Sequence, residues 1–314
     1  MAKEFREVKN AINITGAVKE QKLELGKNKD GETVMMGSIV VKAGDFREVE
    51  VNVYTKQKTK KGTDNKTFLV LEKLKNEEAK TMANAKEDEE ITKVRVFGNN
   101  GFAPHFKEDM FKKKDVDEVA TKIKIDLGFG SVVIDNTIKE EDYKAEFDIE
   151  VYVQTIEEEL DKEENETGRV KIRGWLPVYG GKVIPIDMIA GTVMDEGEEI
   201  NIAEGIQDMV EEGSTFNAWG EINFEKIVEK VKKGGSIGKA KIETKNTYIN
   251  ELVITGGDVI EEEEKELDGE LVKEAKLERD KAIEEKRKEE PKEEKKSKGL
   301  SKGGAKPTRE RPKF

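Results

Sequence analysis

Residues 68–85, FLVLEKLKNEEAKTMANA, interrupt a chain that otherwise alternates in the manner of β-strands. Their apolar residues form a stripe near the start at helical spacing, which predicts an α-helix. Strand-like segments with β-branched residues flank this helix on both sides. Three precede it, at 10–18, 32–43 and 47–56, and two follow it, at 92–98 and 121–134. The predicted order is therefore three strands, a helix and two strands.

The same order returns roughly 125 residues later with little identity between the halves. Asn201 is a suitable N-cap for a second helix, which we expect to end before Gly213. The predicted elements are strands at 145–156, 168–179 and 182–193, a helix at 201–212, and strands at 214–224 and 246–260. We interpret this as two copies of one domain type, at 1–137 and 143–260, with a boundary near the polar stretch 136–142.

The charge of the chain is unevenly distributed. The 314 residues carry a formal net charge of −12, and 40% of them are charged. Residues 1–75 have a net charge of +5, whereas residues 76–150 carry −7 and residues 151–260 carry −10. A bound polyanion responds to the local potential within about a Debye length, so the first domain is the expected site for one.

The composition changes after residue 260. Residues 261–290 are highly charged with a thin apolar stripe, which predicts a solvated helix that Pro291 ends. Residues 291–314 are predicted to be a disordered basic tail, because they have too few apolar residues to bury. Eight basic residues lie between Lys295 and Lys313.

Three strands, a helix and two strands is also the order of an OB-fold, a five-stranded barrel that often binds oligonucleotides. Four stretches add a closer resemblance: INITGAV (12–18), REVEVNVYTK (47–56), EEGSTFNAWGEI (211–222) and YINELVITGGDVI (248–260). They resemble the first strand, third strand, helix exit with fourth strand, and closing strand of bacterial-type single-stranded-DNA-binding proteins. The resemblance implies a mainly β chain of two tandem OB-like barrels, each with one helix. Two such domains on one chain are a departure from the family, which some bacteriophage and archaeal versions share.

Binding of single strands without sequence preference requires cations along the backbone and aromatic faces on which bases stack. The stretch YTKQKTKKGTDNKTF (54–68) concentrates lysine between two aromatic residues. If the strand continues, alternation places Tyr54 on the same side as its lysines at 56, 58 and 60. The predicted interface comprises Lys42, Arg47, Tyr54, Lys56, Lys58, Lys60, Lys61, Lys66, Arg95, Phe97 and Phe102 in the first domain, and Arg173, Trp175 and Tyr179 in the second.

Some of these features have simpler explanations. The lysine stretch is also typical of a solvated hairpin loop whose charges discourage edge pairing. At least one of Phe97, Phe102 and Phe106 is expected to fill the barrel interior, and Trp219 is expected in the core because it alternates with apolar neighbours.

The sequence predicts no catalysis, cofactor or metal site. It has no cysteine, and His105 is the only histidine, with no nucleophile elbow around it. GKNKDG and VKKGGSIGKA do not match a P-loop, and the acidic runs at 195–199 and 261–264 lack EF-hand spacing. No run of about eighteen apolar residues could span a bilayer. We therefore expect a soluble cytoplasmic protein, in the host cytoplasm if it comes from a bacteriophage.

The leading hypothesis is a single-stranded-DNA-binding protein for replication or recombination. Two alternatives stay open: a protein-interaction or phage-assembly module with OB-like barrels, and an RNA-binding protein. We expect the basic tail to be a second, disordered contact with DNA. The resemblance implies instead that the terminal Phe314 docks into a partner protein, and a third alternative is that the tail folds back on the acidic segment 261–294.

Overall fold

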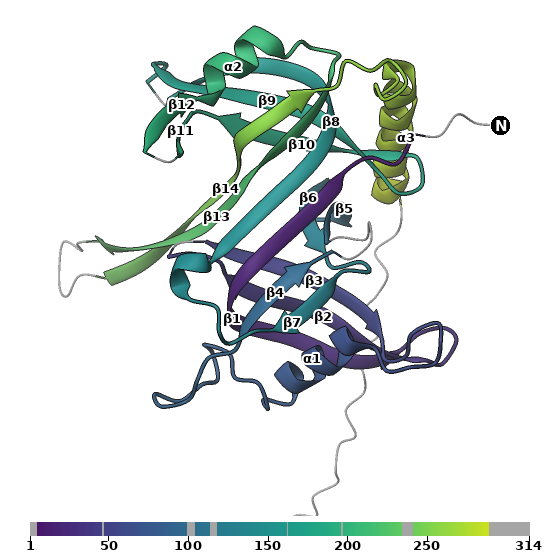
Figure 1. The fold of residues 1–314 in the computed structure, drawn as a ribbon, viewed down its shortest axis with the longest axis vertical. Coiled ribbons are helices and arrows are strands. Elements are labelled where there is room, and N and C mark those ends of the chain that lie inside the picture. The colour runs from purple at the N-terminus through teal and green to yellow at the C-terminus, as the bar shows by residue number, and fades with distance from the viewer. Residues whose placement is uncertain are drawn as a thin grey trace, which may run out of the picture.

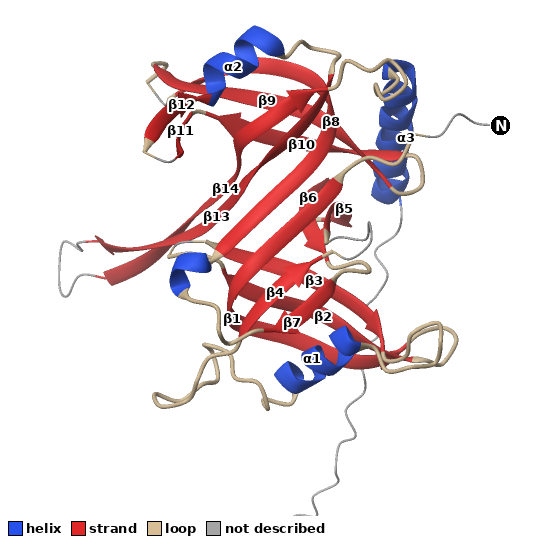
Figure 2. Cartoon of the chain, in the orientation of Figure 1, coloured by secondary structure: helices blue, strands red, loops and turns tan. Residues whose placement is uncertain are grey.

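The structure, a computed structural model, describes residues 5–45, 47–98, 104–113, 118–161, 163–195, 197–233 and 241–288. Most strands belong to one large mixed sheet, and the described residues contain three α-helices (Figure 1). Strands dominate both halves of the molecule, and the helices lie on the outside of the sheet (Figure 2). The prediction of a mainly β chain is confirmed, and the pattern of strands is consistent with an OB-like fold.

The first half contains one helix among seven strands. In order these are β1 (Asn10–Lys27), β2 (Thr33–Lys42), β3 (Glu48–Lys56), α1 (Lys66–Lys75), β4 (Lys93–Phe97), β5 (His105–Lys112), β6 (Val119–Asp126) and β7 (Ser131–Ile134). β1, β2 and β3 pair antiparallel, β6 pairs parallel with β3, and β4 joins β7 to β1. β6 and β7 are separated only by a short turn, so the chain leads from β6 through β7 and β4 back to β1.

The second half follows a similar path, and its last two strands are long, with 19 residues each. Its elements are β8 (Lys144–Leu160), β9 (Glu166–Val178), β10 (Lys182–Ala190), the small hairpin β11 (Thr192–Asp195) and β12 (Glu198–Asn201), α2 (Ile202–Met209), β13 (Thr215–Lys233) and β14 (Lys241–Val259). The pairing order is β8-β9-β10-β14-β13, and β13 also pairs with β8, which closes a ring. As in the first half, one pair is parallel, between β10 and β14.

The first strands of the two halves join them into one body. Residues 10–15 of β1 pair antiparallel with residues 144–149 of β8, and the two strands run side by side through the middle of the molecule (Figure 1). Apolar residues that alternate along these strands point into one continuous core. Ile12, Ile14, Phe147 and Ile149 are all buried within it. The two halves therefore share a hydrophobic core across this seam.

The helices differ from their predicted lengths at the ends. α1 begins at the N-cap Asn65 but ends at Lys75 rather than residue 85, because the following chain bonds to β1 instead. The N–H groups of Met82 and Ala83 donate to β1 carbonyls at 2.9 Å each. α2 has the predicted N-cap, since the Asn201 side chain accepts a hydrogen bond from the Glu204 N–H. α3 spans Gly269–Lys288 within the predicted charged segment.

One predicted strand is divided, and one strand was not predicted. The segment 121–134 was expected as one strand but is divided into β6 and β7 by a turn at residues 127–130, where the Gly130 N–H donates to the Leu127 carbonyl. Residues 105–112, for which no strand was predicted, form β5, which pairs with β6 along its whole length. The basic tail predicted at 291–314 lies outside the described residues.

Candidate nucleic-acid interface

The outer surface of β1, β2, β3, β6 and β5 forms one continuous face of the first half, which we call the strand face. Tyr54 lies on it from β3 and is 51% exposed, with Met36 opposite on β2. Asn52 of β3 is in register with Asp126 of β6, so the face continues onto the β5–β6 ribbon, where Phe111 is 47% exposed. Its members are Lys22, Glu24, Met36, Glu50, Asn52, Tyr54, Lys56, Lys107, Asp109, Phe111, Lys122, Lys124 and Asp126.

Two loops beside this face, residues 27–32 and 56–66, form what we call the basic rim. The Gln57 N–H donates to the Thr33 carbonyl at 2.9 Å, which holds the loops together. The rim contains seven lysines and three carboxylates, a net charge of +4. The lysines are Lys27, Lys29, Lys56, Lys58, Lys60, Lys61 and Lys66, and the carboxylates are Asp30, Glu32 and Asp64. The excess positive charge of the first half is therefore concentrated at one end of the strand face.

The lysine stretch within the rim forms a short hairpin. β3 ends at Lys56, so Lys58 and Lys60 do not continue the side of Tyr54 as predicted. The Thr59 N–H donates to the Thr63 carbonyl at 2.8 Å, and Lys58 pairs with Asp64 across the hairpin at 2.6 Å. Lys60 and Lys61 occupy the exposed tip and have no ion pair among the described residues. Cations at the tip of an ordered loop remain available to an incoming phosphate.

The lysines of the strand face itself are neutralised by neighbouring carboxylates. The pairs are Lys22–Glu20 at 3.0 Å, Lys56–Glu32 at 2.5 Å, Lys107–Asp126 at 3.1 Å, Lys122–Glu50 at 3.9 Å and Lys124–Asp109 at 2.5 Å. A phosphate on this face would have to compete with these carboxylates, whereas the rim offers unpaired charge.

Two of these carboxyl groups have pKa values below the ordinary range. A hydrogen bond from Lys56 lowers the pKa of Glu32, and the same bond raises the pKa of Lys56. Burial acts to raise the pKa of Asp126, but hydrogen bonds from the Gly128 N–H and from Lys107 outweigh it, and the net shift is downward. Both carboxylates therefore stay ionised at neutral pH and hold their lysines in place.

Several predicted cations lie away from the strand face. Arg47 bonds Glu221 of β13 at 2.5 Å, which makes it a link between the halves. Arg95 pairs with Asp135 at 2.9 Å on β4, a strand that borders β1 and β7 rather than β2 or β3. Lys42 is half-buried at the end of β2. The structure does not bring these three residues together with Tyr54, because each lies on a different part of the sheet.

The structure describes two of the three phenylalanines predicted at or after the end of β4. Phe106 is buried, which confirms that one of them fills the interior. Phe97 is half-buried at the end of β4, and Phe102 lies outside the described residues.

The predicted residues of the second half are dispersed. Arg173 on β9 lies 3.7 Å from Asp187 and 4.0 Å from Glu157, so its charge is offset. Trp175 is half-buried beneath α3, whereas Tyr179 is fully exposed in the turn after β9. The expectation that Trp219 lies in the core is wrong: it is 37% exposed and packs against Gly256, which has no side chain to keep the ring away.

The sequence did not predict that the β5–β6 ribbon belongs to the strand face, or that the loop at 27–32 belongs to the basic rim. Phe111 and the three ribbon lysines reach the strand face only because β6 pairs with β3. The alternation of HFKEDMFK (105–112) was the available signal, but charged residues on both sides of the strand weaken it. The residues of the strand face and the basic rim that were not predicted are Lys27, Lys29, Lys107, Phe111, Lys122 and Lys124.

The described part of the chain contains no group of three or more histidine, cysteine, aspartate or glutamate side chains arranged to hold a metal ion. In the same ranges, no helix has the length and apolar character needed to cross a bilayer.

The chain belongs to the YorF family, whose model matches residues 9–289. No curated protein matches it in sequence. Among solved structures it is similar to a deletion mutant of the single-stranded DNA binding protein from Thermus aquaticus, with a TM-score of 0.42, 8% identity, and coverage of 82% of this chain and 96% of that one. The wild-type form of that protein gives a TM-score of 0.41 at 7% identity, covering 81% and 94%.

A Replication Protein A heterotrimer bound to single-stranded DNA is more remote, with a TM-score of 0.17, 7% identity, and coverage of 78% of this chain and 49% of that one. These likenesses are distant, and what the chain binds has to be inferred from its own surface.

Proposed function

We propose that this chain binds single-stranded DNA without sequence preference, through the strand face and basic rim of its first half. The observation that carries the proposal is the half-exposed Tyr54 on a sheet surface bordered by a rim of net charge +4. Such a protein acts where single strands are exposed, and we place it in replication or recombination. The proposal assigns the chain no catalytic step.

The connectivity of the strands supports the interpretation that each half is an OB barrel and that the two barrels follow one another along the chain. In the second half the strand pairing returns to the first strand, and in the first half the turn from β6 to β7 leads back to it through β4. In each half a helix follows the third strand, and in the second half the small hairpin β11–β12 comes before it. OB barrels bind oligonucleotides on the face of their second and third strands and with the loops that join strands one to two and four to five. In the first half these regions are β2 with β3, the loop at 27–32, and the β5–β6 ribbon.

Those three regions hold the groups that single strands require. Bases stack on aromatic faces regardless of sequence, and Tyr54 and Phe111 are both exposed on the strand face. Phosphates are attracted by unpaired cations, and Lys27, Lys29 and Lys60 lie exposed on the rim. The paired lysines of the strand face can exchange a carboxylate for a phosphate at the cost of an ion pair, which favours moderate rather than tight binding.

A titration of labelled oligo-dT with the full chain, followed by fluorescence anisotropy at two salt concentrations, tests the proposal. We expect binding that weakens steeply as salt rises, because bound phosphates release counterions. A parallel titration with oligo-U asks whether RNA is the better ligand. Absence of binding to either polymer at low salt would contradict the proposal and favour the protein-interaction hypothesis.

Changing Tyr54 to alanine is expected to weaken binding of oligo-dT by roughly 1–3 kcal/mol, the value of one stacked base. The matched control is Tyr54→Phe, which keeps the aromatic face and should bind within about twofold of the parent. Thermal unfolding of both variants should match that of the parent, since the side chain is half-exposed. Equal affinities for the alanine and phenylalanine variants would remove Tyr54 from the interface.

A further inference from the structure

The C-terminal helix α3 lies across the outer surface of the second half. It packs against β10 of the second half and against β5 and β6 of the first, and stands beside the sheet in Figure 1. The chain enters it through Leu267, which is buried and whose N–H donates to the Thr215 hydroxyl at 2.7 Å. The surface of β9 and β10 under α3 corresponds in strand order to β2 and β3, which are open in the first half.

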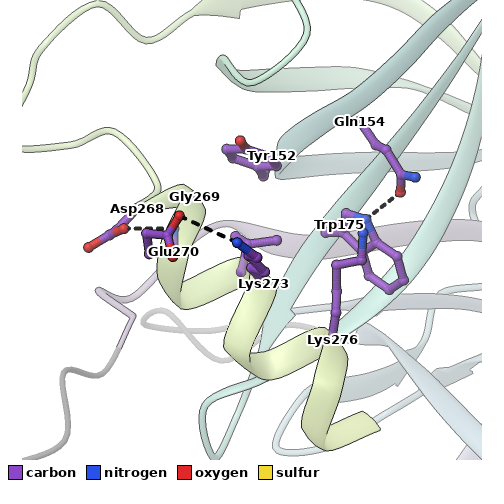
Figure 3. A pocket seen from close by; sticks show the side chains of 9 residues that line it. Tyr152, Gln154, Trp175, Asp268, Gly269, Glu270, Lys273 and Lys276 are labelled. Carbon is purple, nitrogen blue, oxygen red and sulfur yellow. Dashed lines mark hydrogen bonds and ion pairs between the residues drawn. The ribbon is translucent and has the colours of Figure 1, made fainter. Parts of the chain in front are cut away.

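Trp175 is the aromatic residue of that covered surface. It lies on β9 between Tyr152 of β8 and Pro185 of β10, and its ring N–H donates to the Gln154 side chain. The Lys276 ammonium of α3 lies 4.7 Å from the ring centroid, and Figure 3 shows this side chain in front of the indole. The Arg279 guanidinium lies 5.7 Å from the same centroid. Two cations of α3 therefore lie over the indole, where a nucleobase would otherwise stack.

Few residues of α3 are buried against the rest of the chain, although the helix has 20 residues. Val272 and Ala275 are its only buried residues, whereas Leu277 is 55% exposed. The strongest polar contact is with the first half: Arg279 donates two hydrogen bonds to the Glu108 carboxylate, at 2.8 and 2.6 Å. Elements held by few buried contacts open locally at low free energy. The Arg279–Glu108 ion pair and a thin apolar strip therefore hold α3 in place, together with the two cation–π contacts on Trp175 and a hydrogen bond from Lys112 to the Arg287 carbonyl at 2.8 Å.

We propose that α3 is a detachable cover, which blocks a second single-strand site around Trp175 and is latched by the Arg279–Glu108 ion pair. This rests on the proposed function, and it gives the second half a binding surface that is available only when α3 is released. Release of α3 exposes the indole to a base and increases the length of single-stranded DNA that one protein molecule covers. The latch residue Glu108 is on the β5–β6 ribbon of the first half, so closure of the second site depends on the position of that ribbon.

The first test opens the latch by charge reversal. Arg279→Glu places a carboxylate against Glu108, and Lys281→Glu is the matched control, since Lys281 is an exposed residue of the same helix with no ion pair in the described structure. Both variants carry Trp219→Phe, so that tryptophan emission reports Trp175 alone. With oligo-dT we expect strong quenching only in Arg279→Glu. We also expect the covered length to grow by roughly 4–16 nucleotides and the affinity for long strands to rise roughly fivefold or more.

The second test closes the latch covalently. The chain has no cysteine, so Glu108→Cys combined with Arg279→Cys offers one pair of thiols to a short bis-maleimide. Before reaction this variant lacks the ion pair and should behave as the open form. After reaction it should lose the Trp175 quenching and return to the covered length of the parent. Identical behaviour before and after cross-linking would overturn the cover, even if Arg279→Glu were poorly folded.

The remaining outcomes separate this inference from the proposed function. If the parent binds oligo-dT and Arg279→Glu behaves in the same way, the cover is wrong and the first-half interface stands. The cover is also wrong if Trp175 is already quenched in a chain whose only change is Trp219→Phe. If the parent does not bind but the open variants do, the first-half interface is wrong and the covered site stands. If no variant binds, both are wrong.

Discussion

Replacing Phe147 with alanine is expected to lower the free energy of unfolding by about 3–5 kcal/mol. Phe147 is 2% exposed and lies on β8, in register with Ile12 of β1 on one side and Gly220 of β13 on the other. Its removal leaves a cavity at the seam where the two halves share their core. Backbone pairing fixes the strands on both sides, so the cavity has little opportunity to collapse.

Phe111→Ala is the matched control for this prediction. The same side chain is removed, but Phe111 is 47% exposed, so the free energy of unfolding should change by no more than about 0.5 kcal/mol. Urea unfolding would be followed by circular dichroism, which reports both halves, and by tryptophan emission, which reports only the second. The shared core predicts coincident transitions. Two separated transitions in the parent would show that the seam does not couple the halves.

Changing four of the five unpaired rim lysines, Lys27, Lys29, Lys60 and Lys61, to alanine is expected to weaken DNA binding equally for all sequences. Each lost phosphate contact lowers the slope of log affinity against log salt by about 0.7 on single strands, or about 2.8 for all four. Between about 50 and 200 mM salt, that difference corresponds to roughly a 50-fold smaller loss of affinity. Stability should not change, because these side chains make no ion pairs among the described residues.

Removing four lysines elsewhere controls for net charge. Lys73, Lys75, Lys86 and Lys182 lie outside the rim, at the end of α1, in the loop after it and at the start of β10. Their replacement by alanine changes the charge of the chain by the same amount. A similar loss of salt dependence in both variants would mean that the total charge attracts DNA and the rim has no special role. Preserved binding in the rim variant would support the solvated-hairpin interpretation.

Patterns that depend on residues a few positions apart were predicted correctly from the sequence. The alternation of Val49, Val51 and Val53 with polar neighbours identified β3, because successive side chains of a strand point to opposite faces. Asn201 identified the start of α2, because an N-cap bonds to an N–H three residues later. Helix ends were less well predicted: α1 stops at Lys75 because residues 82 and 83 bond to β1, a partner more than sixty positions away.

A mainly β chain with a lysine-rich loop in a basic first half can be predicted from the sequence alone. Those features follow from local periodicity and from charge counted along the chain. Which cations are available depends on the folded arrangement, because an ion pair such as Arg47–Glu221 joins residues that no local pattern relates. The folded arrangement likewise determines that Tyr54 is open whereas Trp175 lies beneath α3. Exposure of an aromatic ring depends on what packs over it, and here that is a helix about one hundred residues further along the chain.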